Sequence, residues 1–159
     1  MKEKINRLIF IVVLYMVYLA VSAQAKPMPA PKLEEAVEKS TIVVAKYQSC
    51  DQSKPIDYFS GVETRFKLVR YITRNKKLKK MPRVGDTIKV NFQFDDGSAC
   101  VAPRPWAFDE KKMLPAKNSQ SILFLSDQVN GVFQTYRGSY GIKKYSSEIE
   151  KGILESLVR

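Results

Sequence analysis

Two segments of regular alternation constrain the fold of this chain more than any other feature of its sequence. From Gly61 to Thr73, and again from Thr87 to Phe94, apolar side chains alternate with polar or charged ones. Successive side chains of a β-strand point to opposite faces, so each segment predicts a strand with one buried and one exposed side. The expected buried side carries Val62, Thr64, Phe66, Leu68 and Ile72 of the first segment and Ile88, Val90, Phe92 and Phe94 of the second. Together the segments predict a long hairpin over residues 61–94.

Further strands follow from local composition. The β-branched run Thr41–Tyr47 and the apolar run Ser121–Ser126 each predict a buried strand. A turn at residues 130–131 is expected to return the chain along residues 132–136, and Ala99–Ala102 predicts a short strand after the turn at residues 95–98. Residues 106–120 show no period and predict a long loop.

A helix is predicted at each end of this strand-rich region. Residues 32–40 suit a short helix, with acidic residues early and Lys39 late. Ser147 and Glu150 have the spacing of a capping box at the start of a C-terminal helix. The expected apolar face of that helix consists of Ile149, Ile153, Leu154 and Leu157. We therefore expect a mainly β fold in a single domain over residues 32–159: a small antiparallel barrel or sandwich of about five strands between two helices.

The first 25 residues have the pattern of a secretory signal. The basic residues Lys2, Lys4 and Arg7 precede an unbroken apolar run of 14 residues, Leu8–Val21. Ala23 and Ala25 offer a cleavage site before Lys26. A membrane-spanning helix needs about 20 apolar residues, which favours cleavage over an uncleaved anchor. Residues 26–31 contain three prolines and predict a tether. We expect a secreted or periplasmic protein with no stable membrane anchor after cleavage.

The mature chain is strongly basic and contains no histidine. Removal of residues 1–25 takes away three of the 27 basic and one of the 16 acidic residues, which leaves 24 and 15 and a net charge of +9. Such a surface attracts anions, although a basic exported protein can also be simply soluble. Without histidine the chain lacks the usual general base and metal ligand, and Ser-His-Asp and Cys-His nucleophiles are excluded within it. Acidic pairs at residues 95–96 and 109–110 lack calcium-loop spacing. We predict no enzyme, metal or cofactor.

Cys50 and Cys100 are the two cysteines of the chain. An even number in an exported protein predicts one disulfide, with two buried free thiols as the alternative. The bond would close a loop of about 50 residues, which is worth about 4 kcal/mol in the chain-entropy model. A redox or zinc-binding role is disfavoured, because there is no C-x-x-C spacing and two distant thiols make a poor zinc site.

A run of basic residues lies at the expected tip of the long hairpin, and no acidic residue follows it until Asp86. The candidate anion-binding residues are Arg70, Arg74, Lys76, Lys77, Lys79, Lys80 and Arg83. A projecting cationic loop can bind phosphate, sulfate or carboxylate groups, and Tyr71 beside it could stack on a ligand. The alternative is a solvated turn that keeps the hairpin from pairing with its neighbours.

Three further aromatic residues are binding candidates. Trp106, between prolines, could stack on a sugar or a base, or it could plug one end of the barrel together with Phe108. Tyr136 and Tyr140 flank a glycine next to Arg137 and could form a binding edge. The alternative for these tyrosines is a bulged strand with outward side chains.

A family resemblance rests on four stretches and on the glycine-broken segment that follows them. The stretches are LEEAVEKSTIVVAKY, TRFKLVRYI, VGDTIKVNF and SILFLS. In these the chain resembles small exported bacterial proteins with an OB-like barrel, which are similar to the netrin-like domain of tissue inhibitors of metalloproteinases. The resemblance covers Leu33–Ile142 and implies an OB-like barrel. In those inhibitors an N-terminal cysteine chelates the catalytic zinc, whereas Lys26 and Pro27 stand at the predicted N-terminus here, so that activity is not implied.

We therefore expect an exported, non-catalytic binding domain that contacts an anionic ligand, or an envelope or extracellular protein, through the basic hairpin loop. The expected anionic partners are a polysaccharide or an envelope lipid, with nucleic acid as the weaker alternative. Two other functions stay open: an inhibitor of a secreted or host enzyme, suggested by the resemblance, and a hydrolase that works without histidine.

The leader and the cysteines together predict the mass of the exported protein. We expect the intact mass of a chain that begins at Lys26, and a gain of two hydrogens on reduction of the bond between Cys50 and Cys100. Mass spectrometry with and without reductant measures both. A full-length chain that starts at Met1 and gains no mass on reduction would contradict the prediction.

Overall fold

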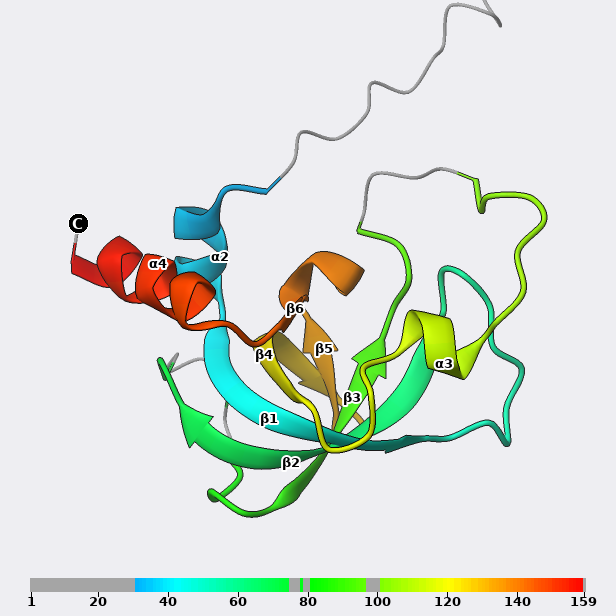
Figure 1. Cartoon of the computed structure of the whole chain (residues 1–159), viewed down its shortest axis with the longest axis horizontal. Helices are drawn as coiled ribbons and strands as arrows, with labels where there is room; N and C mark the ends of the chain where they lie inside the picture. The colour runs from blue at the N-terminus through cyan, green and yellow to red at the C-terminus, as the bar shows by residue number, and fades with distance from the viewer. Residues whose placement is uncertain (1–30, 75–77, 79–80, 97–100, 159) are drawn as a thin grey trace, which may run out of the picture.

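The strands of this chain form one sheet that closes into a barrel (Figure 1). The computed structural model describes residues 31–74, 78, 81–96 and 101–158. Its strands are β1 (Thr41–Cys50), β2 (Val62–Tyr71), β3 (Thr87–Phe92), β4 (Gln120–Val129), β5 (Val132–Thr135) and β6 (Ile142–Lys144). In the order β1-β2-β3-β5-β4-β6, direct pairing of β1 with β4 closes the first five strands, and β6 extends the sheet beyond β4. The expected OB-like barrel of about five strands is confirmed.

One pairing of the barrel differs from the expected antiparallel pattern. The predicted long hairpin is present, with Val62 of β2 opposite Phe92 of β3, and β1 is antiparallel to both of its neighbours. The strands β3 and β5, however, lie parallel. An odd number of strands in a closed ring cannot all alternate in direction, so a five-stranded barrel must contain at least one parallel pair. The barrel is therefore mixed.

Two hydrophobic clusters stabilise the fold, one on each side of the barrel wall. The interior cluster is formed by the inward side chains of the strands, among them Val43, Tyr47, Phe66, Leu68, Val90, Leu123 and Phe133. The second cluster lies outside, where α2 (Leu33–Lys39) and α4 (Ser147–Val158) cover outward side chains of β1 and β4. Figure 1 shows the two helices side by side on this surface. Among the described residues, α2 and α4 leave the outward side chains of Arg65, Lys67 and Lys89 exposed.

The connection between β3 and β4 contains a helix that the sequence did not predict. Within the expected loop of residues 106–120, the segment Glu110–Met113 forms α3, and the Asp109 side chain caps it by accepting from the Lys111 amide at 3.1 Å. Four residues are too few to show a helical period. Of the short strand expected at Ala99–Ala102, residues 99–100 lie outside the described residues, and Val101 and Ala102 are not in a strand.

The C-terminal helix is capped and buried differently from the prediction. The hydroxyl of Ser146, not Ser147, accepts from the backbone amide of Ile149 at 3.2 Å. Ile153 is fully buried and Ile149 partly so, but the expected contact residues Leu154 and Leu157 are 46% and 48% exposed. Gly152 faces Leu33 of α2, which shows that the helix packs through the side containing Gly152 and Ile153. The turn η1 (Gly138–Gly141) precedes β6.

Gly61 lies where the loop after β1 enters β2, and a substitution there tests how closely this point packs against β3. It has φ +73°, and an added Cβ would clash with the carbonyl oxygen of Phe92 on β3. Gly131 has a similar φ of +82° but nothing within 4 Å of an added Cβ. We predict that Gly131→Ala costs about 1 kcal/mol through left-handed strain alone, and that Gly61→Ala costs at least about 2 kcal/mol. Urea unfolding measures both, and equal losses would contradict the packing described here.

Candidate anion-binding face

The part of the outer barrel wall that the helices leave uncovered is basic. On β1 the outward side chains Ile42 and Val44 lie under the helices, and the next outward residue, Lys46, is exposed. The neighbouring β2 presents Arg65 and Lys67, and β3 presents Lys89, all exposed. We call Lys46, Arg65, Lys67 and Lys89 the basic face.

The strand register pairs these cations with one another. Lys46 lies directly opposite Lys67, and Arg65 lies directly opposite Lys89. Directly opposite side chains have Cβ atoms about 4.5–5.5 Å apart, so like charges at such positions destabilise the sheet. Lys89 is compensated by Glu63 at 2.8 Å, but within the described residues the other three cations form no ion pair. The face therefore carries more positive charge than its ion pairs compensate.

A groove of about 440 Å³ adjoins the basic face. One wall is the loop between β1 and β2, residues 51–61, and the other is the β4–β5 turn at Val129 and Asn130. Its floor consists of outward side chains of β2, β3 and β5, namely Glu63, Lys89, Asn91 and Gln134. Lys89 belongs to both the groove and the basic face. Strands 2 and 3 and the loops beside them are the surface with which OB-type barrels bind oligonucleotides and oligosaccharides.

The charged and polar groups of the groove are held in fixed positions. The side-chain amide of Asn91 donates to the Gln134 side-chain oxygen at 3.2 Å, across the parallel pair β3–β5. At the rim, hydrogen bonds from Ser53 lower the pKa of the Asp51 carboxyl, with smaller contributions from the charges of Lys54 and Arg65. The groove thus contains ionised carboxylates as well as cations.

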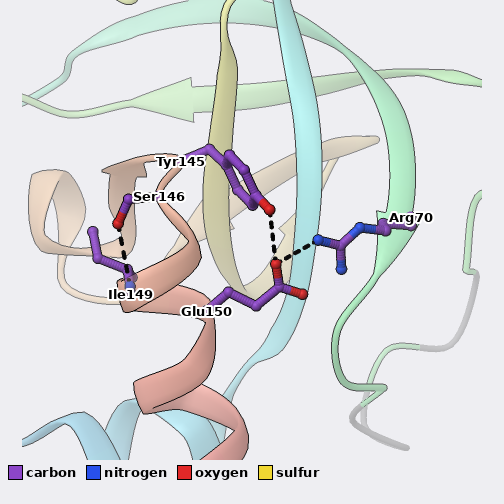
Figure 2. Close-up of polar contacts among 5 residues, drawn as sticks. All are labelled: Arg70, Tyr145, Ser146, Ile149 and Glu150. Atoms are coloured by element: carbon purple, nitrogen blue, oxygen red, sulfur yellow. Dashed lines mark hydrogen bonds and ion pairs between the residues drawn. The ribbon is translucent and has the colours of Figure 1, made fainter.

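Arg70, one of the predicted anion-binding residues, is engaged within the protein. Its guanidinium bonds the Glu150 carboxylate of α4 at 2.6 Å, and the Tyr145 hydroxyl donates to the same carboxylate at 3.0 Å (Figure 2). The bond to Glu150 raises the pKa of Arg70. The sequence did not reveal this contact, because Glu150 is 80 residues away. Arg70 joins β2 to the helix layer and does not belong to the basic face.

The other residues of the basic hairpin are partly described. Arg74 lies over the ring of Tyr71 at 4.4 Å, and the Tyr71 hydroxyl donates to the carbonyl of Pro82 at 2.6 Å. The backbone amide of Arg83 donates to the Asp86 carboxylate at 2.8 Å. The ring of Tyr71 is therefore covered by a cation and half-buried. The predicted residues Lys76, Lys77, Lys79 and Lys80 lie outside the described residues.

The structure places the remaining aromatic candidates in packed clusters. Trp106 and Phe108 both contact the ring of Phe94, with centroids 5.6 and 5.8 Å apart, which agrees with their packing together against the barrel. Tyr136 is 8% exposed and belongs to the cluster beneath the helices. The centroids of its ring and of the Tyr140 ring are 6.3 Å apart. None of these rings lines the groove.

Several predictions concern residues beyond those described. Cys50 is half-buried at the end of β1 and packs against the barrel interior, but Cys100 lies outside the described residues, so the disulfide stays a prediction. The same holds for the signal, its cleavage site and the tether, which fall on residues 1–31 and of which only Pro31 is described. Among the described residues, no group of three or more His, Cys, Asp or Glu could hold a metal ion. The helices in this part of the chain are also too short or too polar to span a membrane.

Neither a family model nor a curated protein matches this chain. The resemblance to netrin-like domains therefore stays a prediction from the sequence.

The basic face was missed from the sequence, although a signal for it was present. The alternation places Arg65, Lys67 and Lys89 on the outward side of their strands. Only the strand register, however, shows that Arg65 of β2 meets Lys89 of β3 and that Lys67 of β2 meets Lys46 of β1. The contiguous run at residues 70–83 was the stronger signal along the chain.

The contact of Arg70 with Glu150 predicts a pH-dependent stability. The Arg70 hydrogen bond, assisted by Tyr145, holds the pKa of the Glu150 carboxyl below its ordinary value of 4.5. A lowered carboxyl pKa stabilises the fold above the unfolded-state value, and this contribution is lost as the pH falls through the lowered value. We predict that Glu150→Gln costs up to about 1 kcal/mol at neutral pH, and that the loss shrinks below pH 4.5.

Urea unfolding at neutral pH and below pH 4.5 measures the free energy of unfolding of the variant and of the unchanged protein. Glu155→Gln is the control, because the Glu155 carboxylate is 60% exposed and lies 3.9 Å from Lys151, so we expect little change at either pH. A Glu150→Gln loss that is equal at both pH values would contradict the assignment.

Proposed function

We propose that this protein is an exported, non-catalytic module that binds an anionic polymer through the basic face and the hairpin loop beside it. The observation that carries the proposal is the cross-strand register, which sets Lys46 against Lys67 and Arg65 against Lys89. Such pairs weaken a sheet in the absence of a ligand. An anion bound between them would turn the repulsion into charge-assisted hydrogen bonds.

The geometry of the face suits a polymer better than a single small anion. The two like-charged rows are two residues apart along β2, which corresponds to about 7 Å. The row of Lys46 and Lys67 is the one nearer the hairpin loop, because Lys67 pairs with Thr87, the first residue of β3. A chain with repeated negative groups could therefore contact both rows and continue toward Arg74 and Arg83.

The absence of histidine supports a binding role rather than a catalytic one, since the usual general base is missing. The net charge of +9 expected for the mature chain supports an anionic partner and fast, salt-dependent association. The expected leader supports a partner outside the cytoplasm.

Charge reversal tests the proposal. We predict that Lys46→Glu/Arg65→Glu/Lys67→Glu weakens binding to linear polyphosphate and to dextran sulfate by at least about tenfold at low salt. The slope of log K against log salt should also fall, because fewer counterions are displaced. Fluorescence titration over a range of NaCl concentrations measures both quantities.

The matched control reverses three exposed lysines outside the basic face, Lys32→Glu/Lys144→Glu/Lys151→Glu, which changes the net charge equally. The proposal expects a much smaller loss for this control, since only the general field of the protein changes. Equal losses for both triple variants would show that net charge, not the basic face, determines binding.

A further inference from the structure

The groove beside the basic face differs from that face in its chemistry. Its charges balance, and three amide side chains contribute to its lining. The charged residues are Asp51, Glu63, Lys54 and Lys89, and the amides are Asn91, Asn130 and Gln134. No aromatic residue lines it. The lining also includes apolar side chains, among them Pro55, Ile56, Val129 and Val132. A ligand segment that fits this groove therefore presents hydrogen-bonding groups together with apolar surface, and it is not densely anionic.

The amides offer donors and acceptors together. The contact of Asn91 with Gln134 uses one amide N–H of Asn91 and fixes both side chains. The side-chain oxygen and the second N–H of Asn91 have no other hydrogen-bond partner among the described residues. A sugar hydroxyl both donates and accepts, so it can pair with such a group, whereas an ionised phosphate only accepts.

The carboxylates of the groove also favour hydroxyl groups over phosphate and sulfate. Asp51 and Glu63 can accept hydrogen bonds from hydroxyls, but they repel phosphate and sulfate. Single-stranded nucleic acids bind through bases stacked on aromatic side chains, which this groove lacks. Hydroxyl-bearing rings therefore suit the groove better than polyphosphate or nucleic acid does.

We propose that the groove and the basic face together bind an acidic glycan. Its hydroxyl-bearing rings occupy the groove, and its anionic substituents, carboxylate or sulfate, lie on Lys46, Arg65 and Lys67. Lys89 stands where the two surfaces meet, since it lines the groove and pairs with Arg65 in the sheet. This inference rests on the proposed function, which requires only that the basic face binds polyanions.

The test compares groove and face variants on different polyanions. The probes are polygalacturonate, which carries carboxylates, dextran sulfate, which carries sulfates, and linear polyphosphate, which has no sugar rings. We expect Asn91→Ala/Gln134→Ala to weaken binding of at least one of the two polysaccharides about tenfold and to leave polyphosphate binding within about twofold. The polysaccharide that is affected identifies the kind of ring that fits the groove. Gln128→Ala, an exposed amide outside the groove, should change neither.

The outcomes separate the two proposals. If the groove variant leaves both polysaccharides unaffected while Lys46→Glu/Arg65→Glu/Lys67→Glu still weakens all three probes, the glycan inference is overturned and the proposed function stands. Equal losses of polysaccharide and polyphosphate by a folded groove variant also overturn it. If Lys46→Glu/Arg65→Glu/Lys67→Glu binds all three probes as tightly as the unchanged protein does, the proposed function itself is overturned. The circular dichroism spectrum of the groove variant shows whether it is folded. If the double variant is not folded, Gln134→Ala alone is measured by the same criteria.

Discussion

The closure of β1 onto β4 is the constraint on which the rest of this structure depends. The strand β1 pairs with β2 along one edge and with β4 along the other, and its residues 42–45 are buried on both faces of the sheet. The inward side chains Val43 and Ala45 fill the barrel, and the outward ones, Ile42 and Val44, bind the helix layer. One strand thus belongs to both hydrophobic clusters. Its next outward residue, Lys46, marks the point where the covered wall ends and the basic face begins.

The charged residues also differ between the helix-covered wall and the uncovered wall of the barrel. The two covering helices carry six of its glutamates, at positions 34, 35, 38, 148, 150 and 155, and the uncovered wall carries the cations of the basic face. Arg70 is the link between these regions, because it reaches from β2 to Glu150 on α4. An anionic partner is therefore attracted more strongly to the uncovered wall than to the helices, which orients the protein on an extended negative surface.

Elements with a clear local pattern could be predicted, and those fixed by distant contacts could not. The alternation around Phe66 and Val90 predicted the hairpin, and the β-branched run from Thr41 predicted β1. The parallel pairing of β3 with β5 follows only from closing an odd number of strands, which no short segment encodes. For the site, the sequence drew attention to residues 70–83, where the cations are neighbours along the chain. The basic face is assembled from three strands, and its two like-charged pairs exist only in the register of the folded sheet.

The most direct test of the central claim, that the uncovered wall of the barrel is the binding surface, is an NMR titration of the labelled protein with a short polyanion. The account predicts chemical-shift changes at the backbone amides of Lys46, Arg65, Lys67 and Lys89, with those of α4 unmoved, and a loss of the changes at high salt. Changes centred on α4 or on the cluster around Trp106, with the amides of β2 and β3 unaffected, would contradict it.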